Sequence, residues 1–124
     1  MPLPDTERTI VALATPPGTA ALAVIRLSGP GAFEVMAQFS APPQRSPAHR
    51  QARVLNIMDG ARLVDKAIAV FFRAPASYTG QDTVEITCHG SPYITRLILN
   101  LAVRNGASLA APGEFTLRAF ANGK

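Results

Sequence analysis

The stretch TVEITCHGSPYITRLILNLAVRNG, residues 83–106, joins an alternating segment to a segment of helical period. In residues 83–89, apolar side chains alternate with Thr, Glu and His, which predicts a half-buried strand with one polar face. Residues 92–104 carry apolar side chains along one stripe, which predicts an amphipathic helix. Ser91 and the proline after it suit the start of this helix, and Gly106 follows its end.

Further elements are predicted on both sides of this strand and helix. Apolar, β-rich runs predict strands at residues 9–15, 20–27, 54–57, 63–72 and 107–110. A Pro-Pro-Gly turn between the first two predicts a hairpin or two neighbouring core strands, and Asp59-Gly60 predicts a second hairpin. A short helix is expected at residues 33–39, and a turn or helix from Pro112 onward.

These elements predict the fold class. Strands and helices do not alternate regularly, so we expect an α+β domain with helices packed on a mixed sheet rather than a doubly wound fold. The whole chain, residues 1–124, is expected to form one domain with its core in residues 8–118. Residues 41–50 hold three prolines and no apolar period, which predicts a mobile surface loop.

The amino-acid composition excludes several classes of protein. The chain of 124 residues is 48% hydrophobic and 16% charged, as expected of one globular domain. A single cysteine, Cys88, excludes an intrachain disulfide, and with only His49 and His89 beside it no metal site is expected. Short apolar runs and a start without a basic-then-apolar pattern predict a cytoplasmic protein without membrane association. The net charge of +4 comes from dispersed arginines, a weak indication of nucleic-acid binding.

Two charged side chains lie in predicted strands. Arg26 is surrounded by apolar residues and needs an anionic or acceptor partner, which is either an acid of the chain or a ligand carboxylate or phosphate. Glu85 lies on the polar face of its strand, where it is either solvated or accepts two parallel hydrogen bonds from an NH and a neighbouring amino group. The residues alone leave both alternatives open.

Two turns resemble anion-binding motifs. The backbone NH groups of His89-Gly90-Ser91 either hold an anion or carbonyl oxygen, or form a plain strand-to-helix turn. Adjacent Cys88 and His89 point to opposite faces and cannot pair as nucleophile and base, so Cys88 is expected in the core. Asn122-Gly123-Lys124 resembles the end of a phosphate-binding loop, but Arg118 stands where that motif needs glycine. We therefore expect no catalytic residue and no GTP hydrolysis by this chain.

Four ordered segments resemble the N-terminal domain of the MnmE (TrmE) family of tRNA-modification GTPases. They are TIVALATPPG (residues 9–18) with IRLSG (25–29), SYTGQD (77–82), EITCHG (85–90), and PGEFTLRAFANGK (112–124). The resemblance implies a fold similar to the tetrahydrofolate-binding domain of aminomethyltransferase-type one-carbon enzymes. It implies binding of 5-formyl-tetrahydrofolate at Arg26, Glu85 and Lys124, with Glu85 facing the amino and NH edge of the pterin. Arg26 and Lys124 would offset the charge of the glutamate tail.

The same resemblance implies partners and a larger protein. The domain would form a homodimer, and the parent protein would add helical and GTPase domains that this chain lacks. GTP, magnesium and potassium would bind only that GTPase domain. With the flavoprotein MnmG, the parent would modify C5 of the wobble uridine of tRNA. The chain departs from the family pattern at Arg8, at residues 19–21, at Gln81 and at Ser91.

Two other functions fit the sequence. The first is a dimerisation module with a vestigial folate pocket, which the changed residues 19–21 favour. The second is a direct tRNA-binding domain, which the positive net charge favours.

Overall fold

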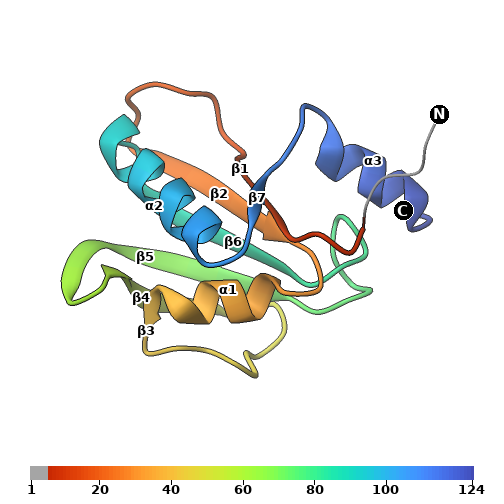
Figure 1. Cartoon of the computed structure of the whole chain (residues 1–124), viewed down its shortest axis with the longest axis horizontal. Helices are drawn as coiled ribbons and strands as arrows, with labels where there is room; N and C mark the ends of the chain where they lie inside the picture. The colour runs from red at the N-terminus through yellow and green to blue at the C-terminus, as the bar shows by residue number, and fades with distance from the viewer. Residues whose placement is uncertain (1–5) are drawn as a thin grey trace.

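The computed structural model of the chain describes residues 6–124 and contains one sheet and three helices (Figure 1). Residues 1–5 lie outside the described residues. The prediction that the start of the chain carries no secretion signal falls mostly on these residues. In chain order the elements are β1 (Ile10–Leu13), β2 (Leu22–Ser28), α1 (Ala32–Gln38), β3 (Ser40–Ala41), β4 (Ala52–Asp59), β5 (Arg62–Phe72), β6 (Thr83–His89), α2 (Pro92–Arg104), β7 (Ser108–Leu109) and α3 (Glu114–Ala121).

The seven strands form a mixed sheet in the order β3-β4-β5-β6-β2-β1-β7. β1 and β7 run parallel, and the other neighbouring pairs are antiparallel. β1 pairs with β2, and β4 pairs with β5 across Asp59 and Arg62, so both predicted hairpins are confirmed. The sheet and its helices confirm the predicted α+β class.

The helices α1 and α2 cover one face of this sheet (Figure 1). α2 begins after Ser91, whose side-chain oxygen accepts a hydrogen bond from the backbone of Ile94 at 3.4 Å, with Pro92 at its first position. Its buried Ile98 and Leu101 join the apolar residues of β2, β5 and β6 in the main hydrophobic core. Burial of this helical stripe is the main force that holds α2 on the sheet.

α1 and α2 leave the opposite face of β2, β4, β5 and β6 uncovered, and α3 reaches that face at Arg26 of β2 through Phe115. Val54 on β4 lies directly beside Ile68 on β5, and the two are 61% and 46% exposed. Leu22 at the start of β2 is also exposed. An antiparallel sheet can face water on one side, but exposed branched apolar residues in register are unusual there.

The helix α3 lies apart from this arrangement, beside the N-terminal segment and the loop that precedes β6 (Figure 1). The predicted turn or helix after Pro112 is thus a helix of eight residues. None of its residues belongs to the main hydrophobic core cluster, which is built from β-strands, α1 and α2. The connection between β3 and β4 contains no helix or strand. No helix in the described part of the chain is long and apolar enough to cross a membrane.

Candidate functional site

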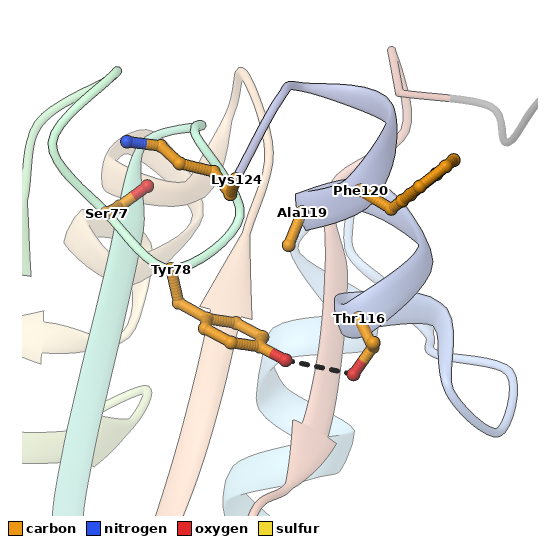
Figure 2. Close-up of a pocket in the computed structure, with 6 residues that line it drawn as sticks. All are labelled: Ser77, Tyr78, Thr116, Ala119, Phe120 and Lys124. Carbon is orange, nitrogen blue, oxygen red and sulfur yellow. Dashed lines mark hydrogen bonds between the residues drawn. The ribbon is translucent and has the colours of Figure 1, made fainter.

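A cavity of about 470 Å³ lies between the 73–82 loop and α3. One wall is formed by Ser77 and Tyr78 of the loop, and the other by residues of α3 and the chain end that follows it (Figure 2). The residues of the second wall are Thr116, Ala119, Phe120 and Lys124. A volume of this size falls in the range of small-molecule sites, about 300–1,000 Å³.

The side chains of two lining residues join the walls of the cavity. The hydroxyls of Tyr78 and Thr116 are 2.9 Å apart and form a hydrogen bond (Figure 2). Tyr78 is 51% exposed, and Phe120 is 80% exposed with its ring pointing away from Tyr78 and from the Lys124 side chain (Figure 2). The face of Tyr78 together with one ammonium group suits a flat ring that carries negative charge at its other end.

Arg26 and Glu85 lie opposite each other on neighbouring strands β2 and β6. The Nε and NH2 groups of Arg26 donate hydrogen bonds to the same oxygen, Oε2 of Glu85, at 3.0 and 2.7 Å. The arginine therefore has an acid of the chain as its partner in this structure, one of the two alternatives that the sequence left open. Both side chains are partly exposed, at 26% and 32%, so the pair can be reached by a ligand.

Aromatic residues link this ion pair to the cavity. The guanidinium carbon of Arg26 lies 5.5 Å from the ring centre of Tyr78 and 5.7 Å from that of Phe115. Both distances are within the range of cation–π attraction, which fixes the arginine between the loop and α3. Tyr78 also lines the cavity, so it connects Arg26 and Glu85 to the wall that contains Lys124.

The structure thus places the three predicted site residues in two groups joined by Tyr78. Arg26 and Glu85 are in contact, and Lys124 lies on the cavity. Sequence reasoning did not single out Tyr78 or Phe115, although both fall within the segments that carry the family resemblance. Each is an aromatic residue in a polar, turn-rich segment. This feature indicates a binding role only once the fold places the ring beside a cation.

The His89-Gly90 turn has its backbone NH groups occupied by the chain itself. The NH of His89 donates to Oδ2 of Asp65 at 3.0 Å, and the NH of Gly90 donates to the carbonyl oxygen of Ala21 at 3.2 Å. Nδ1 of His89 also contacts Asp65, at 2.8 Å. These contacts favour the plain strand-to-helix turn over the anion site.

The neighbouring cysteine is a core residue, as predicted. Cys88 is buried, and its side chain points away from the exposed His89. Burial raises the pKa of the Cys88 thiol to about 11, with a further contribution from the charge of Asp65. A buried thiol with a raised pKa is chemically inert at neutral pH.

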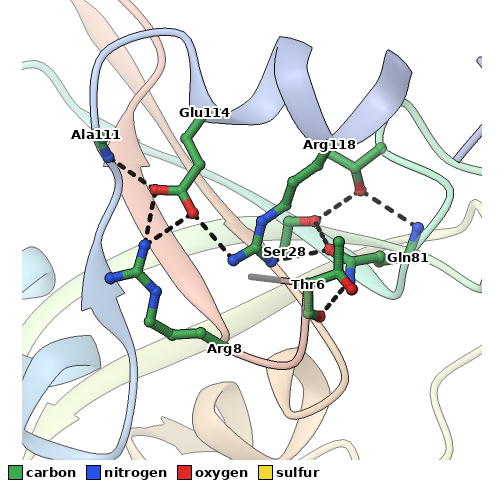
Figure 3. A network of polar contacts seen from close by, with 8 residues as sticks. Thr6, Arg8, Ser28, Gln81, Ala111, Glu114 and Arg118 are labelled. Atoms are coloured by element: carbon green, nitrogen blue, oxygen red, sulfur yellow. Dashed lines mark hydrogen bonds and ion pairs between the residues drawn. The ribbon is translucent and has the colours of Figure 1, made fainter. Parts of the chain in front are cut away.

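A buried polar network lies on the inner side of α3 (Figure 3). Arg118 is fully buried, and its NH2 and NH1 groups donate to Glu114 and Gln81, each at 3.0 Å. Glu114 also accepts hydrogen bonds from Arg8 at 2.9 and 3.0 Å and from the backbone of Ala111 at 2.9 Å. Sequence reasoning missed this network, whose members come from three distant parts of the chain.

Two departures from the resembled family lie in this network. Arg8 supplies a second cation to Glu114, and the Gln81 side chain accepts from Arg118 while donating to the carbonyl oxygen of Thr6 at 2.6 Å (Figure 3). Both side chains are satisfied by hydrogen bonds, so the polar contacts remain complete with the residues present.

The fold and the cavity together define the class of protein: an α+β domain with a ligand-sized, aromatic-walled cavity at one end of a mixed sheet. The family model described as the N-terminus of the GTP-binding protein TrmE matches residues 9–124. Because the match covers nearly the whole chain, the chain belongs to this family and corresponds to its N-terminal domain.

Several similar proteins carry the name tRNA modification GTPase MnmE. The chain is 52% identical over 120 residues to the one from Christiangramia forsetii, with 94% of this chain and 25% of the relative covered. It is 46% identical over 122 residues to that of Chlorobium phaeobacteroides, with 93% and 26% covered. It is 45% identical over 116 residues to that of Thermotoga maritima, with 94% and 26% covered. The chain thus spans about a quarter of the length of these relatives.

Proposed function

We propose that this chain is the folate-binding and dimerisation domain of a cytoplasmic tRNA-modification GTPase. The domain holds 5-formyl-tetrahydrofolate as the one-carbon donor, and the parent protein acts with MnmG on C5 of the tRNA wobble uridine. GTP, magnesium and potassium belong to the GTPase part of that parent. The observation that carries the proposal is the cavity between the 73–82 loop and α3, whose Tyr78 links Lys124 to the Arg26–Glu85 pair.

The cavity residues fit the chemistry of a folate. The ring of Tyr78 suits stacking against a flat heteroaromatic ring, and Lys124 suits the carboxylates of a glutamate tail. Oε1 of Glu85 is not used by Arg26, so this oxygen is available to a ring NH or amino group while the ion pair stays intact. When bound, the folate supplies the one-carbon unit, and the chain binds and orients it.

The uncovered sheet face supports the dimerisation part of the proposal. Val54 and Ile68 lie side by side on neighbouring strands, with Leu22 exposed at the start of β2. If two copies met through this face in a two-fold symmetric contact, each subunit would bury the same apolar side chains. Removing this apolar area from water would favour the dimer.

Calorimetric titration with 5-formyl-tetrahydrofolate tests the binding proposal. We expect the wild-type chain to bind and Lys124→Ala to weaken binding about tenfold, the value of one charge-assisted contact of about 1.4 kcal/mol. Arg96→Ala is the control, because Arg96 is an exposed cation on α2, away from the cavity lining and from the open sheet face. Absence of binding to the dimeric wild-type chain would contradict the proposal.

The two alternative functions, a dimerisation module and a tRNA-binding domain, predict different results when the same chain is titrated with folate or tRNA. A dimer that shows no folate response indicates the dimerisation module with a vestigial pocket. Binding of tRNA that weakens steeply as salt is raised indicates the direct tRNA-binding domain.

A further inference from the structure

The helix α3 docks on the rest of the chain through a polar stripe. Glu114, Arg118 and Asn122 follow one another at intervals of four residues, so they lie on one side of the helix. The first two are buried, with Arg118 fully so, whereas Phe120 on another side is 80% exposed. This arrangement reverses the usual pattern, in which a helix buries its apolar side.

Each part of the stripe is bonded to another segment of the chain. Arg118 donates to Gln81 of the 73–82 loop, and Nδ2 of Asn122 donates to the carbonyl oxygen of Thr79 at 2.9 Å. A Cβ atom built on Gly80 would lie 2.9 Å from the Cβ of Asn122, so loop and helix are in close contact at this point. At the other end of the helix, Glu114 binds Arg8.

Two partners of this stripe, Thr79 and Gln81, adjoin the loop wall of the cavity in the chain. Tyr78 stands next to Thr79 and close to Gln81 in the loop, and α3 supplies the opposite wall. The main hydrophobic core contains no residue of α3, so apolar packing in that core does not set the separation of the two walls. The hydrogen bonds of the stripe and the Tyr78–Thr116 contact join them directly, and Arg26 bridges them through its contacts with Tyr78 and Phe115.

We propose that Arg118 is a positioning residue for the ligand cavity: through Gln81 it holds α3 against the 73–82 loop, while Glu114 of the same helix orients its guanidinium, and so Arg118 sets the width of the cavity. The proposal rests on the proposed ligand-binding function, since it assigns a role within the same site. Arg118 is not among the residues that line the cavity. Its planar group serves two acceptors on different segments at once, which the single ammonium group of a lysine does poorly.

Tyrosine fluorescence can report the position of the loop directly. The chain has no tryptophan and two tyrosines, Tyr78 and Tyr93, so a Tyr93→Phe background leaves Tyr78 as the one tyrosine emitter. In this background we expect Arg118→Met to increase the quenching of Tyr78 by acrylamide. Hydrogen exchange should quicken in α3 and the 73–82 loop while β2 and β6 stay protected. Binding of 5-formyl-tetrahydrofolate should weaken about tenfold.

Two further variants sharpen the test. Arg118→Lys should act in the same direction as Arg118→Met, because it can keep the Glu114 contact within α3 and lose the Gln81 contact that joins α3 to the loop. Gln81→Leu removes the acceptor on the loop and should change the three measurements in the same direction as Arg118→Met. It keeps the test possible if Arg118→Met does not fold. Arg96→Met, an exposed arginine on α2, is the matched control and should leave all three measurements unchanged.

The outcome that overturns this proposal differs from the outcome that overturns folate binding. Unchanged Tyr78 quenching and unchanged exchange in the loop, in a folded Arg118→Met or Gln81→Leu chain, would show that Arg118 does not position the cavity. A wild-type chain that binds no folate would reject the ligand instead, while the quenching and exchange results would still decide the role of Arg118.

Discussion

Glu114 has a carboxylate that accepts hydrogen bonds from a backbone NH and two arginines. Burial by itself raises the pKa of this carboxyl, but the hydrogen bonds from Ala111, Arg8 and Arg118 outweigh burial and lower the pKa. Because the folded pKa lies below the ordinary value of 4.5, the carboxylate stabilises the fold above that value. This stabilisation is lost as the pH falls through the lowered pKa.

We expect Glu114→Gln to reduce the free energy of unfolding at neutral pH by about 2 kcal/mol, the contribution of hydrogen bonds to a charged group. The wild type should approach the variant as the pH falls through the lowered pKa of Glu114, because its carboxylate is then protonated. Urea unfolding at a series of pH values measures both effects. Glu34→Gln, which removes an exposed partner of Arg45, is the control and should change little. A constant difference between the Glu114→Gln and wild-type curves would count against this assignment.

Single residues also show the limit of prediction from sequence. The position of Arg26 in an apolar strand predicted that it needs a partner, and the structure supplies Glu85. The choice of Glu85 depends on the register of β2 and β6, which joins residues 59 positions apart. For the same reason the Arg8–Glu114 pair, 106 positions apart, could not be foreseen.

At the scale of elements, local patterns predicted most of the fold. β6 and α2 have the bounds that alternation, capping and helical period predicted, because one buried face decides each of them. β4 is longer than the predicted residues 54–57, since its first residues are exposed and carry no apolar signal. The docking of α3 was not predicted, because its buried side is polar and a helical apolar stripe is the signal that sequence reasoning uses.

The contact between α3 and the 73–82 loop can be tested with a pair of glycine variants. Gly80 and Gly60 both have positive φ angles, 81° and 60°, but only a side chain at Gly80 would meet Asn122. We expect Gly60→Ala to cost about 1 kcal/mol of unfolding free energy, from backbone strain alone. Gly80→Ala should cost clearly more and also weaken folate binding. Equal losses in thermal or urea unfolding would contradict the close contact.

At the scale of the whole molecule, the two proposed roles use neighbouring parts of one sheet face, since the strand register places Arg26 and Glu85 on the same face as Ile68. Both main helices lie on one face of the sheet (Figure 1). The opposite face exposes Val54 and Ile68, and the cavity is lined by the 73–82 loop, α3 and the chain end that follows it. The sequence predicted the mixed sheet and its helices. It could not predict which sheet face stays open, because that depends on where α1 and α2 cross the strands.

The open face gives a prediction about assembly. We expect Ile68→Asp to raise the dissociation constant of the dimer by at least about tenfold, since it buries an unpaired charge in the proposed contact. Val103→Asp is the control, because Val103 is a similarly exposed apolar residue on α2, outside that face. Light scattering over a range of concentrations measures the dimer. Equal effects of the two substitutions would place the contact elsewhere.

The central claim is that the cavity between the 73–82 loop and α3 binds a folate. Amide chemical-shift mapping by NMR, during titration of the full chain with 5-formyl-tetrahydrofolate, tests it most directly. The account predicts saturable shifts concentrated in residues 77–82 and 114–124, with smaller shifts at Arg26 and Glu85. Saturable shifts confined to other regions, or no shifts at all, would contradict it.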